Sequence, residues 1–273
     1  MMSNSANITE KNYRKLVLQV GLGGFSYAVC DTLSSRIRTL KTIDFGSYSG
    51  SSKVEECYWK AFLDNSDLTK TYDEVIVCHD NNLNTFVPTA LFDEELAGSY
   101  LQYNTKVFET DFFAFDAIAN QEMNNVYIPY VNINNYLIDQ FGSFEYRHVN
   151  SILVSKLLDL SKNNDDKQVY VHFASDCFEI IVVQNQQLLL FNSFEYNTKE
   201  DFIYYLLFTA EQLNLNPEYF KLHLLGNITE DSELYKIAYK YVRNVALLDT
   251  SIMQLYNDFS KAENLKHFIL FQS

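Results

Sequence analysis

The sequence predicts a mixed α/β protein built from two related halves, each with a mixed β-sheet flanked by helices. Three observations support this fold class. A run of three β-rich segments separated by turn residues occurs twice, over residues 15–46 and over residues 167–196. Apolar residues at helical spacing follow each run. Strand and helix patterns then alternate, and that order requires a sheet covered by helices.

The first run reads KLVLQVGLGGFSYAVCDTLSSRIRTLKTIDFG. Its β-rich segments predict three antiparallel strands, at residues 17–20, 25–30 and 39–45. Three glycines between the first two strands permit the backbone conformations of a tight turn. They are Gly21, Gly23 and Gly24. The segment is therefore a predicted β-meander.

The second run reads KQVYVHFASDCFEIIVVQNQQLLLFNSFEY. It predicts a second meander, with strands at residues 169–173, 178–183 and 188–194 and turns at residues 174–176 and 185–186. The two meanders match in length, in the order of their parts and in the placement of their turns. This match favours duplication of one unit over the chance occurrence of two hairpins.

Helix-capping signals follow both meanders. Ser51 or Ser52 can cap a helix to Leu63, and Thr198 can cap another, with Asp201 near the capping-box position. Further strands are expected at residues 74–78, 112–118, 126–131, 144–149, 220–225, 245–248 and 267–271, with an extended segment at 86–87. Further helices are expected at residues 89–103, 132–140, 150–160, 198–213 and 229–242.

These elements divide the chain into three parts. Residues 1–14 form a flexible N-terminal tail, residues 15–150 the first half and residues 151–273 the second half. Only 8 glycines and 3 prolines occur in 273 residues, and none gather in a linker, so structured segments should join the halves.

The charge balance excludes some partners. The formal net charge of −14, from 21 basic and 35 acidic side chains, repels phosphate backbones, so we do not expect nucleic acid as a partner. No segment approaches the about 18 consecutive apolar residues of a transmembrane helix, and the polar N-terminus does not resemble a signal peptide. We therefore expect a cytoplasmic protein without direct membrane insertion.

Metal-binding or catalytic motifs are not evident. Histidines and cysteines lack the spacing of a metal site, and the cysteines are expected to be reduced and mostly buried. These residues are His79, His148, His172, His223, His267, Cys30, Cys57, Cys78 and Cys177. In the predicted strand ending at Cys78 and His79, neighbours point to opposite faces, which predicts a core thiol beside a surface histidine.

Two other groups of residues can be interpreted either as ordinary structural residues or as functional ones. Glu109, Asp111 and Asp116 could perform acid–base work, but solvated surface carboxylates are the favoured interpretation. The second group consists of three tyrosines bracketed by asparagine runs. They form either part of a protein interface or core-facing aromatic positions on one strand and one helix. These are Tyr127, Tyr130 and Tyr136.

A β-meander that opens an α/β domain and is repeated once resembles the actin-like ATPase fold, a pair of ribonuclease H-like domains with a nucleotide cleft between them. The second meander is similar to the actin-like proteins of type IV pilus assembly. The chain also resembles an uncharacterised bacterial domain-of-unknown-function family with this fold. The resemblance covers about residues 15–249, as a pattern of elements rather than as identities.

This resemblance implies three nucleotide-contacting turns. The first carries an aspartate and small residues, and here Gln19 stands at the position of the aspartate, before Gly21, Gly23 and Gly24. A glutamine cannot bind Mg²⁺ as an anion. The backbone N–H groups of such a turn can hold phosphate.

The other two turns are also altered. The second turn normally reads Asp-x-Gly, and here His172 and Ala174 stand at those positions while Asp176 is displaced. The third turn normally contains two glycines, and here it has Gly226 followed by Asn227. An asparagine tolerates left-handed dihedral angles, so a similar turn is expected.

Two hypotheses of different classes follow. The first is a non-catalytic actin-like-fold protein that acts through protein–protein interaction, with a partner or with itself, and has a degenerate nucleotide site without cofactor or metal. The alternative is a divergent actin-like ATPase that binds ATP with Mg²⁺ through the glycine turns and Asp176. A sugar or metabolite kinase relative would need a catalytic aspartate, and the sequence offers no candidate.

Overall fold

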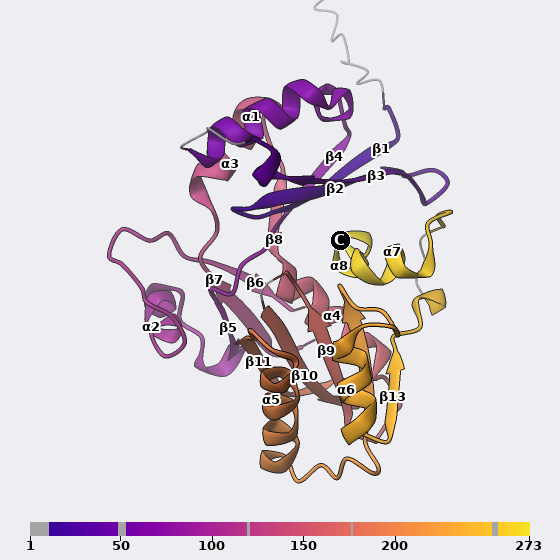
Figure 1. The fold of residues 1–273 in the computed structure, drawn as a ribbon. Coiled ribbons are helices and arrows are strands. Elements are labelled where there is room, and N and C mark those ends of the chain that lie inside the picture. Colours follow the sequence, from indigo (N-terminus) through magenta and orange to yellow (C-terminus); the bar gives the residue numbers. More distant parts are fainter. Residues whose placement is uncertain (1–10, 49–52, 119–120, 176, 253–255) are drawn as a thin grey trace, which may run out of the picture. The chain divides into compact units, whose positions relative to one another are not determined.

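The computed structural model describes residues 11–48, 53–118, 121–175, 177–252 and 256–273, which fold into two compact units (Figure 1). The described residues of the first unit are 11–48, 53–78, 130–146 and 256–257. Those of the second are 79–118, 121–129, 147–175, 177–252 and 258–273. Among the described residues, no helix combines the length and the apolar character needed to cross a bilayer.

The first unit is built on a five-stranded sheet with the order β3-β2-β1-β4-β8. Its strands are β1 (Arg14–Val20), β2 (Gly24–Asp31), β3 (Arg36–Asp44), β4 (Glu74–His79) and β8 (Glu145–His148). The first three pair antiparallel, as predicted for the first meander. β4 and β8 pass into the second unit at their last residues.

Aromatic packing forms the core of the first unit. α1 (Val54–Asp64) and α3 (Val131–Phe141) contact one another beside the sheet. Phe25 of β2 stacks on Tyr58 of α1 with ring centroids 4.9 Å apart, and Phe62 meets Tyr136 edge-on at 5.3 Å. Tyr130 also packs on this core, so the tyrosines of α3 and its start face the interior. Ser51 and Ser52, the expected caps, lie outside the described residues, and the helix begins at Val54.

The second unit contains a five-stranded sheet with the equivalent order, β11-β10-β9-β12-β13. Its strands are β9 (Gln168–Phe173), β10 (Cys177–Gln184), β11 (Gln187–Glu195), β12 (Lys221–Gly226) and β13 (Asn244–Leu247). β9 to β11 form the second predicted meander, and β12 runs parallel to both β9 and β13. Asn185 and Gln186 have φ values of 43° and 64°, which suit the tight turn of a hairpin.

Helices bury both faces of the central strand β10, in which Phe178 to Val183 are all buried. On one face, Phe202 of α5 (Lys199–Gln212) meets Phe173 and Phe178 edge-on, at 5.0 and 5.3 Å. α4 (Val149–Leu160) contacts β10, β11 and α8 (Phe268–Gln272). Figure 1 shows α6 (Glu233–Tyr241) beside α5.

A separate three-stranded sheet completes the second unit, with the order β5-β7-β6. Its strands are β5 (Asn84–Pro88), β6 (Ala114–Ala117) and β7 (Met123–Tyr127), and α2 (Ala97–Leu101) packs on it. Val87 and Val126 of the sheet and Leu101 of α2 form its small apolar core. β7 ends two residues before Pro129, earlier than the strand expected to residue 131, and Tyr130 instead precedes α3.

The helix expected over residues 89–103 is wrong. The segment forms two short 3₁₀ turns, Thr89–Leu91 and Glu94–Leu96, before α2. Asp93 is extended and its carboxylate accepts the N–H of Glu95, while the Tyr100 hydroxyl donates to the carbonyl of Leu91. These side chains satisfy backbone groups that a continuous helix would have paired internally.

The strand expected over residues 267–271 is also wrong, because His267 lies at the turn between two helices and residues 268–271 belong to α8. Ser260 and Glu263 form a capping box that starts α7 (Lys261–Lys266), and α8 follows directly. Phe268 to Phe271 are all buried, and a short run that is apolar on every side has no periodicity to separate a strand from a buried helix. The helix expected from residue 229 begins later, at Glu233, where the Ser232 side chain caps it.

The cap of α5 provides a direct test of the fold. Thr198 Oγ1 accepts the N–H of Asp201, and the Asp201 carboxylate accepts the N–H of Thr198, which is the predicted capping box. We expect Thr198→Ala to lower the free energy of unfolding by about 1 kcal/mol in urea denaturation, because an N–H at the helix start loses its acceptor. Thr198→Ser keeps the acceptor and should retain most of the stability. Equal stability of all three proteins would contradict the assignment.

Candidate functional site

The first candidate turn is held by a hydrogen bond within the turn and by two from neighbouring residues. The Gly21 N–H donates to the carbonyl of Gly24 at 3.0 Å, and the Tyr58 hydroxyl donates to the carbonyl of Gly21 at 3.0 Å. The Gly23 carbonyl accepts the N–H of Phe45 at 2.9 Å. The turn is therefore held by the core helix α1 and by the residue after β3, which fixes its shape without a ligand.

The glycines and Gln19 of this turn have different surroundings. A Cβ on Gly24 would lie 2.3 Å from the carbonyl oxygen of Ile43, so sheet packing between β2 and β3 requires the glycine. A Cβ on Gly23 would meet nothing within 4 Å. Gln19 is half-buried on β1, opposite Ser26. The first turn thus offers an amide at the position where the resemblance implies a metal-binding carboxylate.

The second turn contains a buried histidine–carboxylate pair. His172 Nδ1 on β9 lies 2.8 Å from Glu179 Oε2 on β10, and the two residues are only 8% and 4% exposed. The two atoms are within hydrogen-bond distance, so the bond satisfies His172 Nδ1 and one carboxylate oxygen of Glu179. The Cys177 thiol donates to Glu179 Oε1 at 3.7 Å. Burial raises the pKa of Cys177 to about 12, which keeps the thiol protonated and excludes it as a nucleophile near neutral pH.

The third turn lies against the second because β9 and β12 are parallel neighbours whose carboxyl ends share an edge. The Asn227 N–H donates to the carbonyl of Phe173 at 2.8 Å. Gly226 has a φ of +86°, and a Cβ there would lie 2.3 Å from the Phe173 oxygen and 3.0 Å from the His172 ring. Gly226, rather than Asn227, therefore takes the left-handed conformation of this turn.

Ala174 does not strain the second turn. Its φ is not positive, and its N–H donates to the carbonyl of Cys177 at 3.0 Å. Asp176 lies outside the described residues. Of the predicted site residues, the structure brings His172, Ala174, Gly226 and Asn227 together at one edge of the second sheet. Gln19 and the first three glycines belong to the first unit.

These residues do not fit a magnesium nucleotide held in the manner that the resemblance implies. Mg²⁺ in nucleotide sites is bound through one or two carboxylates together with phosphates and water. The first turn supplies Gln19, and the one buried carboxylate near the second turn, Glu179, is bound by His172 and Cys177. Among the residues that the structure describes, no three His, Cys, Asp or Glu side chains are arranged to hold a metal ion.

Asp116 forms a buried polar cluster that sequence reasoning missed. Its carboxylate accepts the N–H of His148 at 2.8 Å, the Ser151 hydroxyl, and the Tyr127 hydroxyl at 3.2 Å. It therefore lies at the start of α4, where the helix dipole favours an anion. The expectation of a solvated surface carboxylate is wrong for Asp116, because β6 turns this side chain toward α4. Burial raises its pKa above the ordinary value.

A chain of hydrogen bonds leads to this carboxylate. The Asn150 amide donates to Asn84 at 3.1 Å, Asn84 donates to Asn125 at 2.9 Å, and Asn125 donates to the Ser151 hydroxyl at 2.9 Å. Ser151 then donates to Asp116. All the hydrogen bonds of the chain run from donor to acceptor in the same direction, so each bond polarises and strengthens the next. The one sequence signal was the repeated asparagine near strand ends, a residue that more often indicates turns.

Two buried histidines border this cluster. His148 Nδ1 accepts the N–H of Asn150 at 3.1 Å, so the hydrogen is on Nε2 and donates to the Asn81 side chain at 3.2 Å. Burial lowers the pKa of His148 to about 3, and the ring stays neutral. His79 is fully buried beside Tyr127, so the expectation of a surface histidine is wrong. The cluster joins β5, β6, β7 and α4, and its groups bond mainly to one another, although Asn150 Oδ1 is buried without a hydrogen-bond partner among the described residues.

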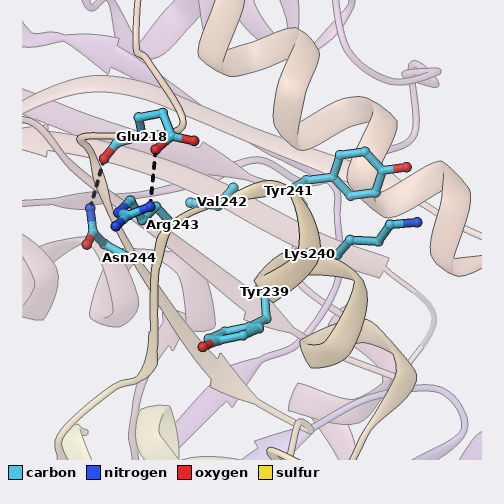
Figure 2. Close-up of a pocket in the computed structure, with 7 residues that line it drawn as sticks. All are labelled: Glu218, Tyr239, Lys240, Tyr241, Val242, Arg243 and Asn244. Carbon is cyan, nitrogen blue, oxygen red and sulfur yellow. Dashed lines mark hydrogen bonds and ion pairs between the residues drawn. The ribbon is translucent and has the colours of Figure 1, made fainter.

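A shallow hollow lies at the other end of the second sheet, between the end of α6 and the start of β13 (Figure 2). Arg243 pairs with Glu218 at 3.6 Å, and the Asn244 amide donates to the Glu218 carbonyl at 3.4 Å. Asn244 pairs with Lys221 at the start of β12, whereas Gly226 ends that strand. The hollow is thus about 17 Å along β12 from the third turn. Ligands of parallel sheets bind at the carboxyl ends of the strands, which argues against this hollow as a nucleotide site.

The two sheets of equivalent strand order define the class of protein: the chain has an actin-like ATPase fold. It is similar to a solved structure from Bacteroides thetaiotaomicron, described as a protein with actin-like ATPase fold and unknown function. The TM-score is 0.77 with 22% identity, over 89% of this chain and 93% of that one. It is also similar to the PilM–PilN type IV pilus biogenesis complex, with a TM-score of 0.57 and 11% identity, over 94% of this chain and 96% of that one.

The family follows from a match over most of the sequence. The model of the family described as protein of unknown function (DUF3822) matches residues 3–245, and the chain belongs to this family. No curated protein matches the sequence. The resemblance to a family of unknown function with an actin-like fold, inferred from the two meanders, is therefore confirmed.

Packing around residue 226 should require a glycine there, because the site has no room for a Cβ. We expect Gly226→Ala to lower the free energy of unfolding by about 2–4 kcal/mol, because a left-handed φ and a close backbone contact both penalise a Cβ. Gly142→Ala is a control with a φ of +79° and open space, and it should cost about 1–2 kcal/mol. Gly23→Ala should change stability by less than about 0.5 kcal/mol. A neutral Gly226→Ala in chemical denaturation would overturn this explanation.

Asp116 should make stability depend on pH. Because its folded pKa is raised above its ordinary value of 3.8, its contribution is full below that value and is lost as pH rises through the folded pKa. The stability of the natural protein relative to Asp116→Asn should therefore fall as pH increases from about 4, measured by urea denaturation. Asp201→Asn is the opposite control, since hydrogen bonds from Asn197 and Thr198 lower the Asp201 pKa. A constant difference for Asp116→Asn would refute the assignment.

Proposed function

We propose that this chain is a non-catalytic actin-like-fold protein that acts by binding another protein, and that its nucleotide site is degenerate. One observation carries the proposal. At the second turn, where the resemblance implies an aspartate that serves a metal, His172 is bound through Nδ1 to the buried Glu179. The position thus presents an imidazole, whereas Mg²⁺ prefers carboxylate, carbonyl and water oxygens.

The electrostatics support the same conclusion. ATP brings several negative charges, which Mg²⁺ and basic groups offset in nucleotide sites. The second and third turns offer no lysine or arginine among residues 172–175 and 226–227, and the nearby carboxylate of Glu179 is buried. The whole chain carries a net charge of −14. Placing a polyphosphate at this edge would therefore bring several negative charges to turns that supply no lysine or arginine.

The protein-interaction part of the proposal has two supports. The PilM–PilN structure is a complex in which a protein of this fold assembles with a partner. On this chain, large aromatic side chains remain exposed where no core requires them, and such residues are enriched at interfaces. The most exposed are Tyr103, Tyr219, Tyr256, Tyr239 and Tyr204.

Titration calorimetry of the full chain with ATP and Mg²⁺ tests the proposal. We expect no binding heat above dilution up to about millimolar nucleotide, and no release of inorganic phosphate beyond that of Mg-ATP alone. The matched variant Glu179→Gln keeps the shape of the buried pair and removes its charge. It should not gain turnover, because the metal-binding carboxylate of the first turn is still missing.

Micromolar binding with turnover would instead support the alternative, a divergent Mg-ATP-binding ATPase. In that event Asp176→Asn and Gly226→Ala are the variants that should abolish it, since they alter the remaining acid and the remaining glycine of the two turns.

A further inference from the structure

α5 exposes an aromatic pair on the face opposite its core contacts. Its buried residues are Phe202, Ile203, Leu206, Thr209 and Ala210. Tyr204 and Phe208 lie one turn apart on the other side, 63% and 48% exposed, and their rings stack with centroids 6.2 Å apart. Two large rings on the solvent side depart from the polar outer face expected of a helix that covers a sheet.

Helix stability does not account for this pair. Tyr205, which lies between the two exposed residues in the sequence, provides the aromatic contact with the sheet: its ring stacks on Phe194 of β11 with centroids 4.5 Å apart. An exposed apolar pair at this spacing stabilises a helix by only about 0.2–0.5 kcal/mol. Exposed neighbouring aromatics are instead the composition of a binding hot spot.

The charges on α5 define what could bind there. Glu200 lies one turn before Tyr204, Glu211 lies three residues after Phe208, and both glutamates are exposed. The single basic residue of the helix, Lys199, pairs with Glu233 of α6 at 2.8 Å. The aromatic pair is therefore bracketed by two carboxylates about 16 Å apart along the helix.

We propose that the outer face of α5, formed by Glu200, Tyr204, Phe208 and Glu211, docks a segment of a partner protein that carries apolar anchors flanked by lysine or arginine. The apolar anchors cover the two rings, and the basic residues meet the two glutamates and the negatively charged ring faces. This inference rests on the proposed function, which it deepens by naming the surface and the chemistry of the partner.

We do not expect a second copy of this chain to bind the outer face of α5. If two α5 helices pack antiparallel, Glu200 of each faces Glu211 of the other, and if they pack parallel, like residues face like. Both arrangements place carboxylate against carboxylate, between chains that each have a net charge of −14. The same charges favour a basic segment, which binds faster and more tightly at low salt.

Selection from a phage-displayed library of random 16-residue peptides on the full chain tests this surface. The selected peptides should contain apolar residues flanked by lysine or arginine, and fluorescence anisotropy should show affinity that weakens with salt. Tyr204→Ala with Phe208→Ala should weaken binding at least tenfold, and Glu200→Lys with Glu211→Lys at least fivefold. Thermal melts check that the variants fold, which their exposed positions favour.

Tyr219→Ala is the matched control, because this tyrosine is 79% exposed on the same unit but lies outside α5. It should bind the peptides within twofold of the natural chain. Absence of binders, binders without basic residues, or equal binding by the α5 variants would overturn the inference. If Mg-ATP also fails to bind, those results leave the proposed function standing with a different interface. Turnover of Mg-ATP would contradict the proposed function, regardless of what α5 binds.

Discussion

The carboxylate of Asp116 is the group on which the second unit most depends. It receives the hydrogen bonds of a chain that begins at Asn150 and crosses from α4 to the small sheet and back. Asp116 is half-buried, and removing its carboxylate from water raises its pKa, a cost that three donors and the start of α4 offset in part. Removing the acceptor would leave several buried donors unsatisfied at once, and each costs about 1–3 kcal/mol.

A second buried polar pair, His172 with Glu179, has the opposite consequence for function. Two side chains on adjacent strands satisfy one another at the edge where the resemblance implies a ligand. In this pair each side chain supplies a hydrogen-bond partner for the other, and leaving one buried partner unsatisfied costs about 1–3 kcal/mol. The same pair thus contributes to the packing of the second sheet and places an imidazole where the resemblance implies a carboxylate.

The sequence predicted the parts of the fold that have strong local signals. Both meanders, their antiparallel pairing and the capping box of α5 could be read because alternation, turn residues and cap spacing are encoded within short windows. The elements that were wrong lacked such signals. Phe268 to Phe271 are apolar on every side, and the segment after Pro88 is shaped by a tyrosine hydroxyl that reaches back nine residues. The pairing of Asp116 with Ser151 depends on tertiary contact, which one sequence does not reveal.

Gly226 shows that packing alone can require a glycine in a turn of this kind. The glycine of a nucleotide turn is ordinarily explained by the approach of a phosphate, yet here the carbonyl of Phe173 and the ring of His172 already occupy the space that a Cβ would need. Selection for folding alone is then enough to keep the residue. A glycine in such a turn can therefore reflect backbone packing rather than ligand binding, and the acidic positions beside it are the better guide to chemistry.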